Sequence, residues 1–152
     1  MTIEVNSEVE MKMLGESIGR LLHGGEIIEL IGDVGSGKTT LVKGIAIGLG
    51  IDEYVQSPSF TINRSYKGRH GISLSHYDFY RLDDAGIMAN ELQEVIGDPN
   101  VVTIIEWGSV VEGVLPKDRI SVHITVSAEN SRELEIGSGG DVSRKLADQI
   151  KL

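Results

Sequence analysis

The chain has 152 residues, with 14 Lys plus Arg, 23 Asp plus Glu and no cysteine. This length suits one domain with its own core, and a hydrophobic fraction of 40% is ordinary for a folded protein. Without cysteine, disulfides, thiolate chemistry and cysteine-ligated zinc are excluded. A formal net charge of −9 opposes broad nonspecific binding to nucleic acid, and no apolar run reaches membrane-spanning or signal-peptide length. We therefore expect a single cytoplasmic domain over residues 1–152 with no membrane segment.

The N-terminal part of the sequence predicts a helix, a strand and a second helix. Ser7 followed by Glu10 is a capping box, and apolar residues at helical spacing continue to about Leu22. Glu26–Ile31 is short, apolar and bounded by glycines, which indicates a buried strand. A glycine-rich loop separates it from a helix over Lys38–Leu49.

Further elements follow in chain order. Ile72–Tyr80 alternates between two faces, which indicates the return strand of a hairpin that begins at Thr61. The remaining patterns predict a helix, a buried strand, an antiparallel pair of strands and a C-terminal helix capped by Asp141; their ranges are Asp83–Ile96, Val101–Ile105, Arg119–Ser127 with Arg132–Ile136, and Asp141–Ile150. We expect an α/β fold, a P-loop NTPase-like three-layer sandwich with parallel core strands, Glu26–Ile31 and Val101–Ile105 among them, and antiparallel flanking strands such as the Thr61–Asp78 hairpin.

The segment from Gly32 to Thr39 matches G-x-x-x-x-G-K-[ST] in full, between a predicted strand and a predicted helix. Glycines there let successive backbone N–H groups turn inward, and the helix start adds the positive end of its dipole. Lys38 adds a point charge for the phosphates, and Thr39 offers a hydroxyl to Mg²⁺. The residues predicted to form this phosphate cradle include Asp33, Val34, Gly35, Ser36, Gly37, Lys38 and Thr39.

Two acids are candidates for the chemistry. Glu106 directly follows a predicted core strand, where open α/β sheets place ligand groups and P-loop proteins place a metal-side acid; otherwise it is a solvated strand-end acid. Asp78 shares a strand face with apolar residues, so it faces a cleft, pairs with Arg81 or caps a turn. His76, on the same face, fits a packed strand histidine better than a catalytic base.

Other features stay open between two readings. Ser57–Thr61 follows the cradle helix by a loop, which fits either a γ-phosphate sensor or an ordinary turn. Trp107 either buries its ring or presents it to a partner. The basic cluster of Arg64, Lys67, Arg69 and His70 fits a solvated hairpin better than a docking site.

Taken in order, these motifs resemble those of the TsaE (YjeE) family of small bacterial ATPases. The resemblance spans nearly the whole chain, and its motifs are Gly32–Thr40, Gly48–Gly50, Ser57–Thr61, His76–Leu82, Ile105–Trp107 and Leu115-Pro116. It implies binding of ATP and Mg²⁺, slow ATPase activity, and support of tRNA threonylcarbamoyladenosine synthesis in a complex with the proteins TsaD and TsaB.

By position, the resemblance also assigns residues. It makes Thr39 and Glu106 the magnesium-side residues, Asp78 and Glu106 necessary for hydrolysis, and Ser57–Thr61 a nucleotide-sensing switch that includes Ser59. Thr40 joins the nucleotide-binding loop, and base-side contacts are implied at Glu8 and Ser131. Two departures from the family pattern are Ser59, where threonine is usual, and Gly108, where proline or alanine often follows Glu-Trp.

Two other functions fit parts of the sequence. A nucleotide-dependent binding switch with incidental hydrolysis fits the loose D-x-x-G at Asp83–Gly86, but the chain has no N-K-x-D segment to read guanine. A nucleotide kinase would need an arginine-rich lid and an acceptor domain, for which the sequence gives no room.

Overall fold

The computed structural model describes residues 1–152 and contains one seven-stranded mixed sheet. The strand order is β1-β7-β6-β2-β5-β4-β3, in which the four central strands β6, β2, β5 and β4 run parallel. Antiparallel strands flank them on both sides. The strands are β1 (Thr2–Val5), β2 (Ile27–Ile31), β3 (Asn63–Lys67), β4 (Ser73–Asp78), β5 (Val101–Glu106), β6 (Ile120–Val126) and β7 (Arg132–Ser138).

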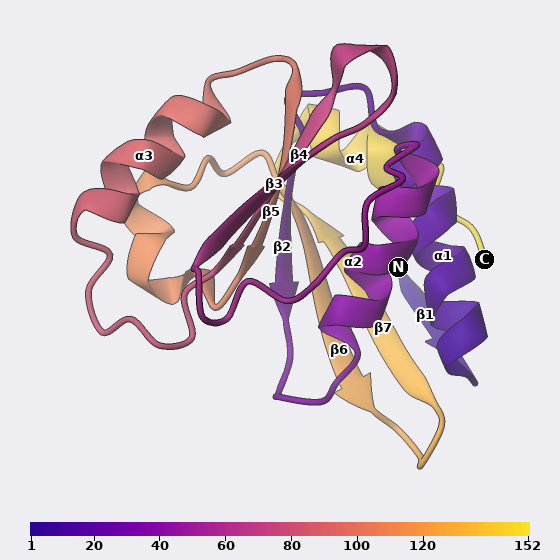
Figure 1. Ribbon diagram of the computed structural model, residues 1–152. Coiled ribbons are helices and arrows are strands. Elements are labelled where there is room, and N and C mark those ends of the chain that lie inside the picture. Colours follow the sequence, from indigo (N-terminus) through magenta and orange to yellow (C-terminus); the bar gives the residue numbers. More distant parts are fainter.

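Helices cover both faces of this sheet, which confirms the three-layer α/β fold (Figure 1). α1 (Glu8–Leu21), α2 (Lys38–Gly48) and α4 (Asp141–Ala147) lie on one face, and α3 (Ile87–Ile96) lies on the other beside the 3₁₀ helix η2 (Gly108–Val114). A short 3₁₀ turn, η1 (Arg69–Gly71), joins β3 to β4. None of the helices is long and apolar enough to cross a membrane.

Alternation along the strands divides the core into two clusters. Leu74 on β4 and Ile104 on β5 point to the α1/α2/α4 face, which buries 27 hydrophobic residues. Tyr77 on β4 and Ile105 on β5 point to the opposite face and belong to a cluster of eight buried residues under α3 and η2. The predicted alternation is therefore confirmed over Ser73–Asp78, with both faces of the strand covered, whereas Tyr80 lies beyond the strand and is exposed.

α1 and α2 pack through glycines at i, i+4 spacing on both helices. A Cβ built on Gly15 would lie 2.4 Å from the Leu41 carbonyl oxygen, and one on Gly44 would lie 2.2 Å from that of Lys12. The pair Gly19 and Gly48 repeats this contact one turn further along. Because each distance is well below a van der Waals contact, the two backbones can approach this closely only where no side chain intervenes.

Several sequence predictions need correction. β1 was not predicted, since four residues with one buried side chain carry no periodic signal. β4 was expected to extend the sheet antiparallel, but it pairs parallel with β5, and only β3 is antiparallel. α3 begins at Ile87 instead of Asp83, because Asp83–Gly86 forms a turn in which Asp84 accepts the Gly86 N–H.

The C-terminal helix is also capped differently from the prediction. Asp141 lies inside α4, and the free N–H groups of Val142 and Ser143 donate to Asp118 on the loop between η2 and β6. These hydrogen bonds, the one with Ser143 foremost, lower the pKa of the Asp118 carboxyl. Val142 is 68% exposed, so Leu146, Ala147 and Ile150 anchor this end in the core.

Arg69, expected on a solvated hairpin, turns inward instead. Its guanidinium donates to the carbonyls of Gly48 at the end of α2 and of Leu22 just after α1. It also reaches the Gly19 and Arg20 carbonyls. Helix C-termini leave their last carbonyls without intrahelical partners, so this one arginine caps the C-terminal ends of both α1 and α2.

Candidate functional site

The phosphate loop lies at the carboxyl edge of the parallel strands, between β2 and α2. Gly35 and Gly37 adopt left-handed conformations with φ of 82° and 108°, which non-glycine residues rarely accept. Lys38 opens α2 and is only 7% exposed. Its Nζ donates to the carbonyl oxygens of Gly32 at 2.6 Å and Asp33 at 2.9 Å, so the lysine is held against the loop.

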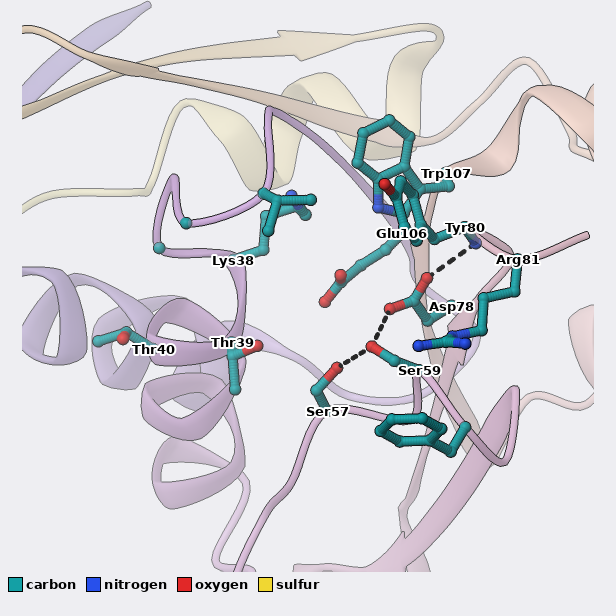
Figure 2. Close-up of a pocket in the computed structure, with 14 residues that line it drawn as sticks. Lys38, Thr39, Thr40, Ser57, Ser59, Asp78, Tyr80, Arg81, Glu106 and Trp107 are labelled. Carbon is teal, nitrogen blue, oxygen red and sulfur yellow. Dashed lines mark hydrogen bonds between the residues drawn. The ribbon is translucent and has the colours of Figure 1, made fainter.

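A cavity of about 520 Å³ opens beside this loop (Figure 2). It brings together the loop, the Ser57–Phe60 segment and the ends of two strands. The residues that line it are Val34, Gly35, Gly37, Lys38, Thr39, Thr40, Ser57, Ser59, Phe60, Asp78, Tyr80, Arg81, Glu106 and Trp107. The predicted loop residues Asp33 and Ser36 do not line it: Asp33 is exposed and offers its carbonyl oxygen to Lys38, and Ser36 is buried.

The two candidate acids are neighbours across the sheet. Asp78 ends β4, Glu106 ends β5, and the strand register pairs them directly. Their exposed fractions are 4% and 3%, although both line the cavity. Because the desolvation of a carboxylate is costly unless it is hydrogen-bonded, each should have a polar partner, and each has one.

Glu106 is paired with His76. The Glu106 Oε1 lies 2.9 Å from His76 Nε2, and the imidazole is fully buried. His76 Nδ1 has no hydrogen-bond partner in the protein. His76 itself does not line the cavity, which fits the strand-histidine reading better than the catalytic-base reading.

Asp78 is held by the segment predicted to act as a switch. Its Oδ2 accepts the Ser59 hydroxyl at 2.9 Å, and Ser59 Oγ lies 2.7 Å from Ser57 Oγ. Its Oδ1 accepts the backbone N–H of Tyr80 at 2.9 Å. Figure 2 shows this chain of contacts along one wall of the cavity, with Glu106 on the side facing Thr39. Asp78 makes no ion pair with Arg81, so that alternative reading is wrong.

Aromatic side chains form the rim of the cavity. Trp107 has φ of 58°, a left-handed conformation that is rare for a bulky residue and marks stored strain beside Glu106. Its ring lies 4.8 Å from that of Tyr80 and 5.1 Å from Lys38 Nζ. Arg81 stacks on Phe60 with 4.5 Å between its Cζ and the ring centroid.

A smaller cavity of about 240 Å³ adjoins the other side of the loop. Glu8 lines it, as the resemblance implies, together with Ser7 and Met11 of the α1 region. Ser131 does not: its hydroxyl donates to Asn6, whereas its neighbours Glu129, Asn130 and Arg132 line the cavity. Gly35, Gly37 and Thr40 belong to both cavities, so these two spaces meet at the phosphate loop.

A buried ion pair supports the strand that feeds the loop. Glu29 on β2 accepts Arg119 Nε at 2.7 Å, and Arg119 also donates to Glu112 of η2. Burial of the guanidinium alone would lower the pKa of Arg119, but the hydrogen bonds with Glu29 and Glu112 outweigh it and raise this pKa. Thus β2 and the segment after Glu106 are tied together behind the cavity.

The donor set suits a magnesium ion shared with phosphate oxygens, rather than one held by protein alone. No group of three or more His, Asp or Glu side chains is arranged to hold a metal. Thr39 and the buried Glu106 are hard oxygen donors that line the same cavity. Mg²⁺ commonly takes one or two protein oxygens and completes its octahedron with phosphate oxygens and water, so these residues fit it.

Sequence reasoning left several residues at these cavities unassigned, among them Phe60, Tyr80, Arg81 and Arg132. Tyr80 and Arg81 directly follow Asp78, so their place after a candidate acid was a usable signal, and Phe60 lies inside the predicted switch segment. Arg132 had no such signal, because its contact with the loop is made over 96 residues of sequence.

Comparison with known proteins places the chain in a family. A family model described as "Threonylcarbamoyl adenosine biosynthesis protein TsaE" matches residues 5–134. The chain belongs to the TsaE family. The relative named tRNA threonylcarbamoyladenosine biosynthesis protein TsaE in Treponema pallidum is 40% identical over 126 residues, covering 80% of this chain and 89% of the relative. The Bacillus subtilis protein of the same name is 33% identical over 146 residues, covering 96% and 90%.

The fold agrees with a solved structure. The crystal structure of Bacillus subtilis YdiB superimposes with a TM-score of 0.82 and covers 99% of this chain and 93% of that one, at 28% sequence identity. The expected resemblance to the TsaE family and the expected fold class are both confirmed.

Proposed function

We propose that this chain is a Mg²⁺-dependent ATPase of slow turnover that supports tRNA N6-threonylcarbamoyladenosine modification together with TsaD and TsaB. Membership of the TsaE family supports the pathway. The observation that carries the ATPase assignment is the meeting, in one cavity, of a complete phosphate loop with the buried acids Asp78 and Glu106. The proposed place of action is the cytoplasm.

The loop would hold the triphosphate through its inward N–H groups and Lys38. Lys38 Nζ now donates to two loop carbonyls within the buried wall of the cavity. When the Lys38 ammonium binds a phosphate, it exchanges these neutral acceptors for anionic ones, which form stronger hydrogen bonds. The ammonium is therefore already held at the loop that would bind the phosphates.

The acids would act on the reacting phosphoryl group. Thr39 and Glu106 would hold Mg²⁺, which when bound supplies positive charge to the phosphate oxygens. Asp78 keeps free lone pairs beyond its bonds to Ser59 and Tyr80, and can orient a water molecule towards the γ-phosphate. His76 fixes the Glu106 carboxylate from behind.

Slow turnover is supported by the state of the cavity's arginine. An arginine that reaches the transferred phosphoryl group stabilises the transition state strongly in related chemistry. Arg81 is the arginine among the cavity-lining residues, and it stacks on exposed Phe60 at the rim. Faster hydrolysis would need Arg81 to swing inward or a partner to supply charge.

A nucleotide-dependent switch is the second candidate, favoured by the Ser57–Ser59–Asp78 chain. A ligand that competes for the Ser59 hydroxyl would release this segment from Asp78 and change the surface near Phe60. In that case nucleotide binding, rather than hydrolysis, would control partner binding.

The test measures ATP binding and ATP hydrolysis separately. Calorimetric titration should show ATP binding in preference to GTP and its loss in Lys38→Ala, with circular dichroism unchanged. Glu106→Ala and Asp78→Ala should still bind ATP but hydrolyse it at least about tenfold more slowly, which corresponds to about 1.4 kcal/mol of barrier. Glu94→Ala, an exposed acid on α3, serves as the matched control.

Partner dependence decides between the two candidates. Rates and tRNA modification are measured with and without TsaD and TsaB. Acid variants that hydrolyse at the parent rate with the partners present would remove the catalytic assignment. Acid variants that do not hydrolyse ATP but still sustain repeated tRNA modification would favour the switch.

A further inference from the structure

Arg132 connects the turn between β6 and β7 to the outer side of the phosphate loop. Its Nε donates to the Ser36 carbonyl oxygen at 3.0 Å. Its Nη1 is held by three carbonyls of its own turn, those of Ala128, Glu129 and Ser131, at 3.0–3.4 Å. In Figure 1 this turn and the loop after β2 lie at the same end of the sheet. The guanidinium is therefore anchored on one side and bonded to the loop on the other.

The acceptor of this bond belongs to a critical peptide unit. In a planar trans peptide the C=O and the following N–H point in opposite directions. Since the Ser36 carbonyl faces Arg132, the Gly37 N–H faces away from it. Gly37 lines both cavities, and its N–H makes no hydrogen bond within the protein. The amide is thus left available as a donor.

This peptide needs an external hold. Gly37 is at φ of 108°, and glycine enters this region without a preference that would keep it there. The Ser36 hydroxyl is buried without a partner, so it does not fix the peptide either. The bond from Arg132 is the hydrogen bond that fixes the carbonyl of this unit. A charged donor also polarises the peptide and strengthens its N–H as a donor.

We propose that Arg132 is a positioning residue that sets the Ser36–Gly37 peptide so that the Gly37 amide is aimed at the phosphates of the nucleotide. This inference rests on the proposed phosphate cradle and adds a residue outside it. Geometry is needed as well as charge: the planar fork reaches the turn and the loop at once, which a lysine ammonium on a flexible stem cannot do equally well. The prediction therefore differs from that for a simple positive charge near the site.

The test is calorimetric titration of inorganic tripolyphosphate with Mg²⁺, and separately of ATP, into the full chain. Arg132→Gln and Arg132→Lys should each bind tripolyphosphate about tenfold more weakly, the effect of one lost charge-assisted contact, with ATP weakened by the same factor. With ATP and Mg²⁺ bound, hydrogen exchange at the Gly37 amide should be faster in Arg132→Lys than in the parent, while the amides within α2 keep their protection. Arg144→Gln, an exposed arginine on α4, controls for the lost charge.

Three results would overturn the inference. Parent affinity in Arg132→Lys would mean that charge alone acts. A loss for ATP without a loss for tripolyphosphate would place Arg132 against the nucleoside. A lowered melting temperature with unchanged affinity would make its role purely structural. Should Arg132→Gln not fold, Arg132→Lys carries the comparison. Lys38→Ala distinguishes a failure of this inference from a failure of the proposed function. If Lys38→Ala also binds tripolyphosphate with parent affinity, the phosphate-cradle assignment is wrong. If Lys38→Ala loses affinity while the Arg132 variants do not, only the role of Arg132 is wrong.

Discussion

The two faces of the sheet differ in how they are built and in what they support. The α1/α2/α4 face buries 27 hydrophobic residues and locks α1 to α2 by backbone contact at four glycines. The α3 face buries eight, and Ile87 at the start of α3 is 80% exposed. The phosphate loop is continuous with the first face through α2, whereas the segment after Asp78 runs into the second.

Because of this difference, we expect the wall of the cavity formed by the phosphate loop to be rigid and the opposite wall to move more easily. A preorganised cradle benefits from a helix that cannot shift, and close backbone contact with α1 runs along α2. The opposite wall, with Ser59, Tyr80 and Arg81, is backed by the smaller cluster and is expected to open locally at lower free energy. Substitutions on the two faces should therefore differ in how much stability they cost and in how far the loss spreads.

Gly44→Ala should cause the largest loss of stability. The new Cβ would lie 2.2 Å from the Lys12 carbonyl oxygen, which is backbone and cannot rotate away. Forcing the helices apart should lower the free energy of unfolding by about 3 kcal/mol, despite the better helix propensity of alanine. Denaturant unfolding measures this. Gly113→Ala in η2, where the Cβ meets nothing within 4 Å, should change little, and equal losses would refute the packing argument.

Leu92→Ala tests the other face. Leu92 is the fully buried residue of α3, and its truncation leaves a void in a small cluster that can partly collapse, so about 2 kcal/mol should be lost. Native-state hydrogen exchange should show this loss in α3 amides, with α1 and α2 amides unchanged. A uniform loss across all helices would mean that both faces unfold as one unit.

His76→Leu probes the boundary between the faces, where Glu106 is held. Leucine fills the buried space but leaves the Glu106 Oε1 without its donor, which should reduce stability by about 1.5 kcal/mol. His76→Gln keeps a donor and should recover part of that loss. Thermal unfolding of both variants measures this difference in stability. Equal stability of His76→Gln and His76→Leu would show that the hydrogen bond to Glu106 contributes nothing.

Asp118→Asn should have the smallest effect, confined to the end of α4. Hydrogen bonding with Ser143 lowers the pKa of Asp118 below its ordinary value of 3.8 in the folded chain. The folded state then binds fewer protons, so this contribution is present above about pH 4 and is lost as the pH falls through the folded pKa. Unfolding between pH 5 and pH 2 should therefore depend less steeply on pH in Asp118→Asn, and an identical slope would contradict the capping role.

The sequence predicted those parts of the site that short segments encode. The loop over Gly32–Thr39 and the strand-end position of Glu106 each depend on a local motif, and the structure brings both to one cavity. Asp78 was placed by alternation on the correct face. The four-residue spacing of glycines in α1 and α2 was also visible, but no local rule says that two such helices meet.

What remained hidden is contact with backbone carbonyls far along the chain. Arg132 and Arg69 both act on carbonyls, which every residue carries, so no side-chain pattern identifies their acceptors. The left-handed Trp107 was likewise unpredictable, because the compensating contacts come from Tyr80 and Lys38 in other segments. Tertiary geometry, not propensity, decides such positions.

The position of Trp107 has a practical consequence. It is the chain's one tryptophan, and its indole lies within about 5 Å of Lys38 Nζ and of the Tyr80 ring. Indole fluorescence responds to nearby charge and to water, so its emission maximum and intensity should change when an anion binds at Lys38, without any added label. The molecule thus carries its own optical probe at the cavity, suited to stopped-flow recording of how quickly the site fills and empties.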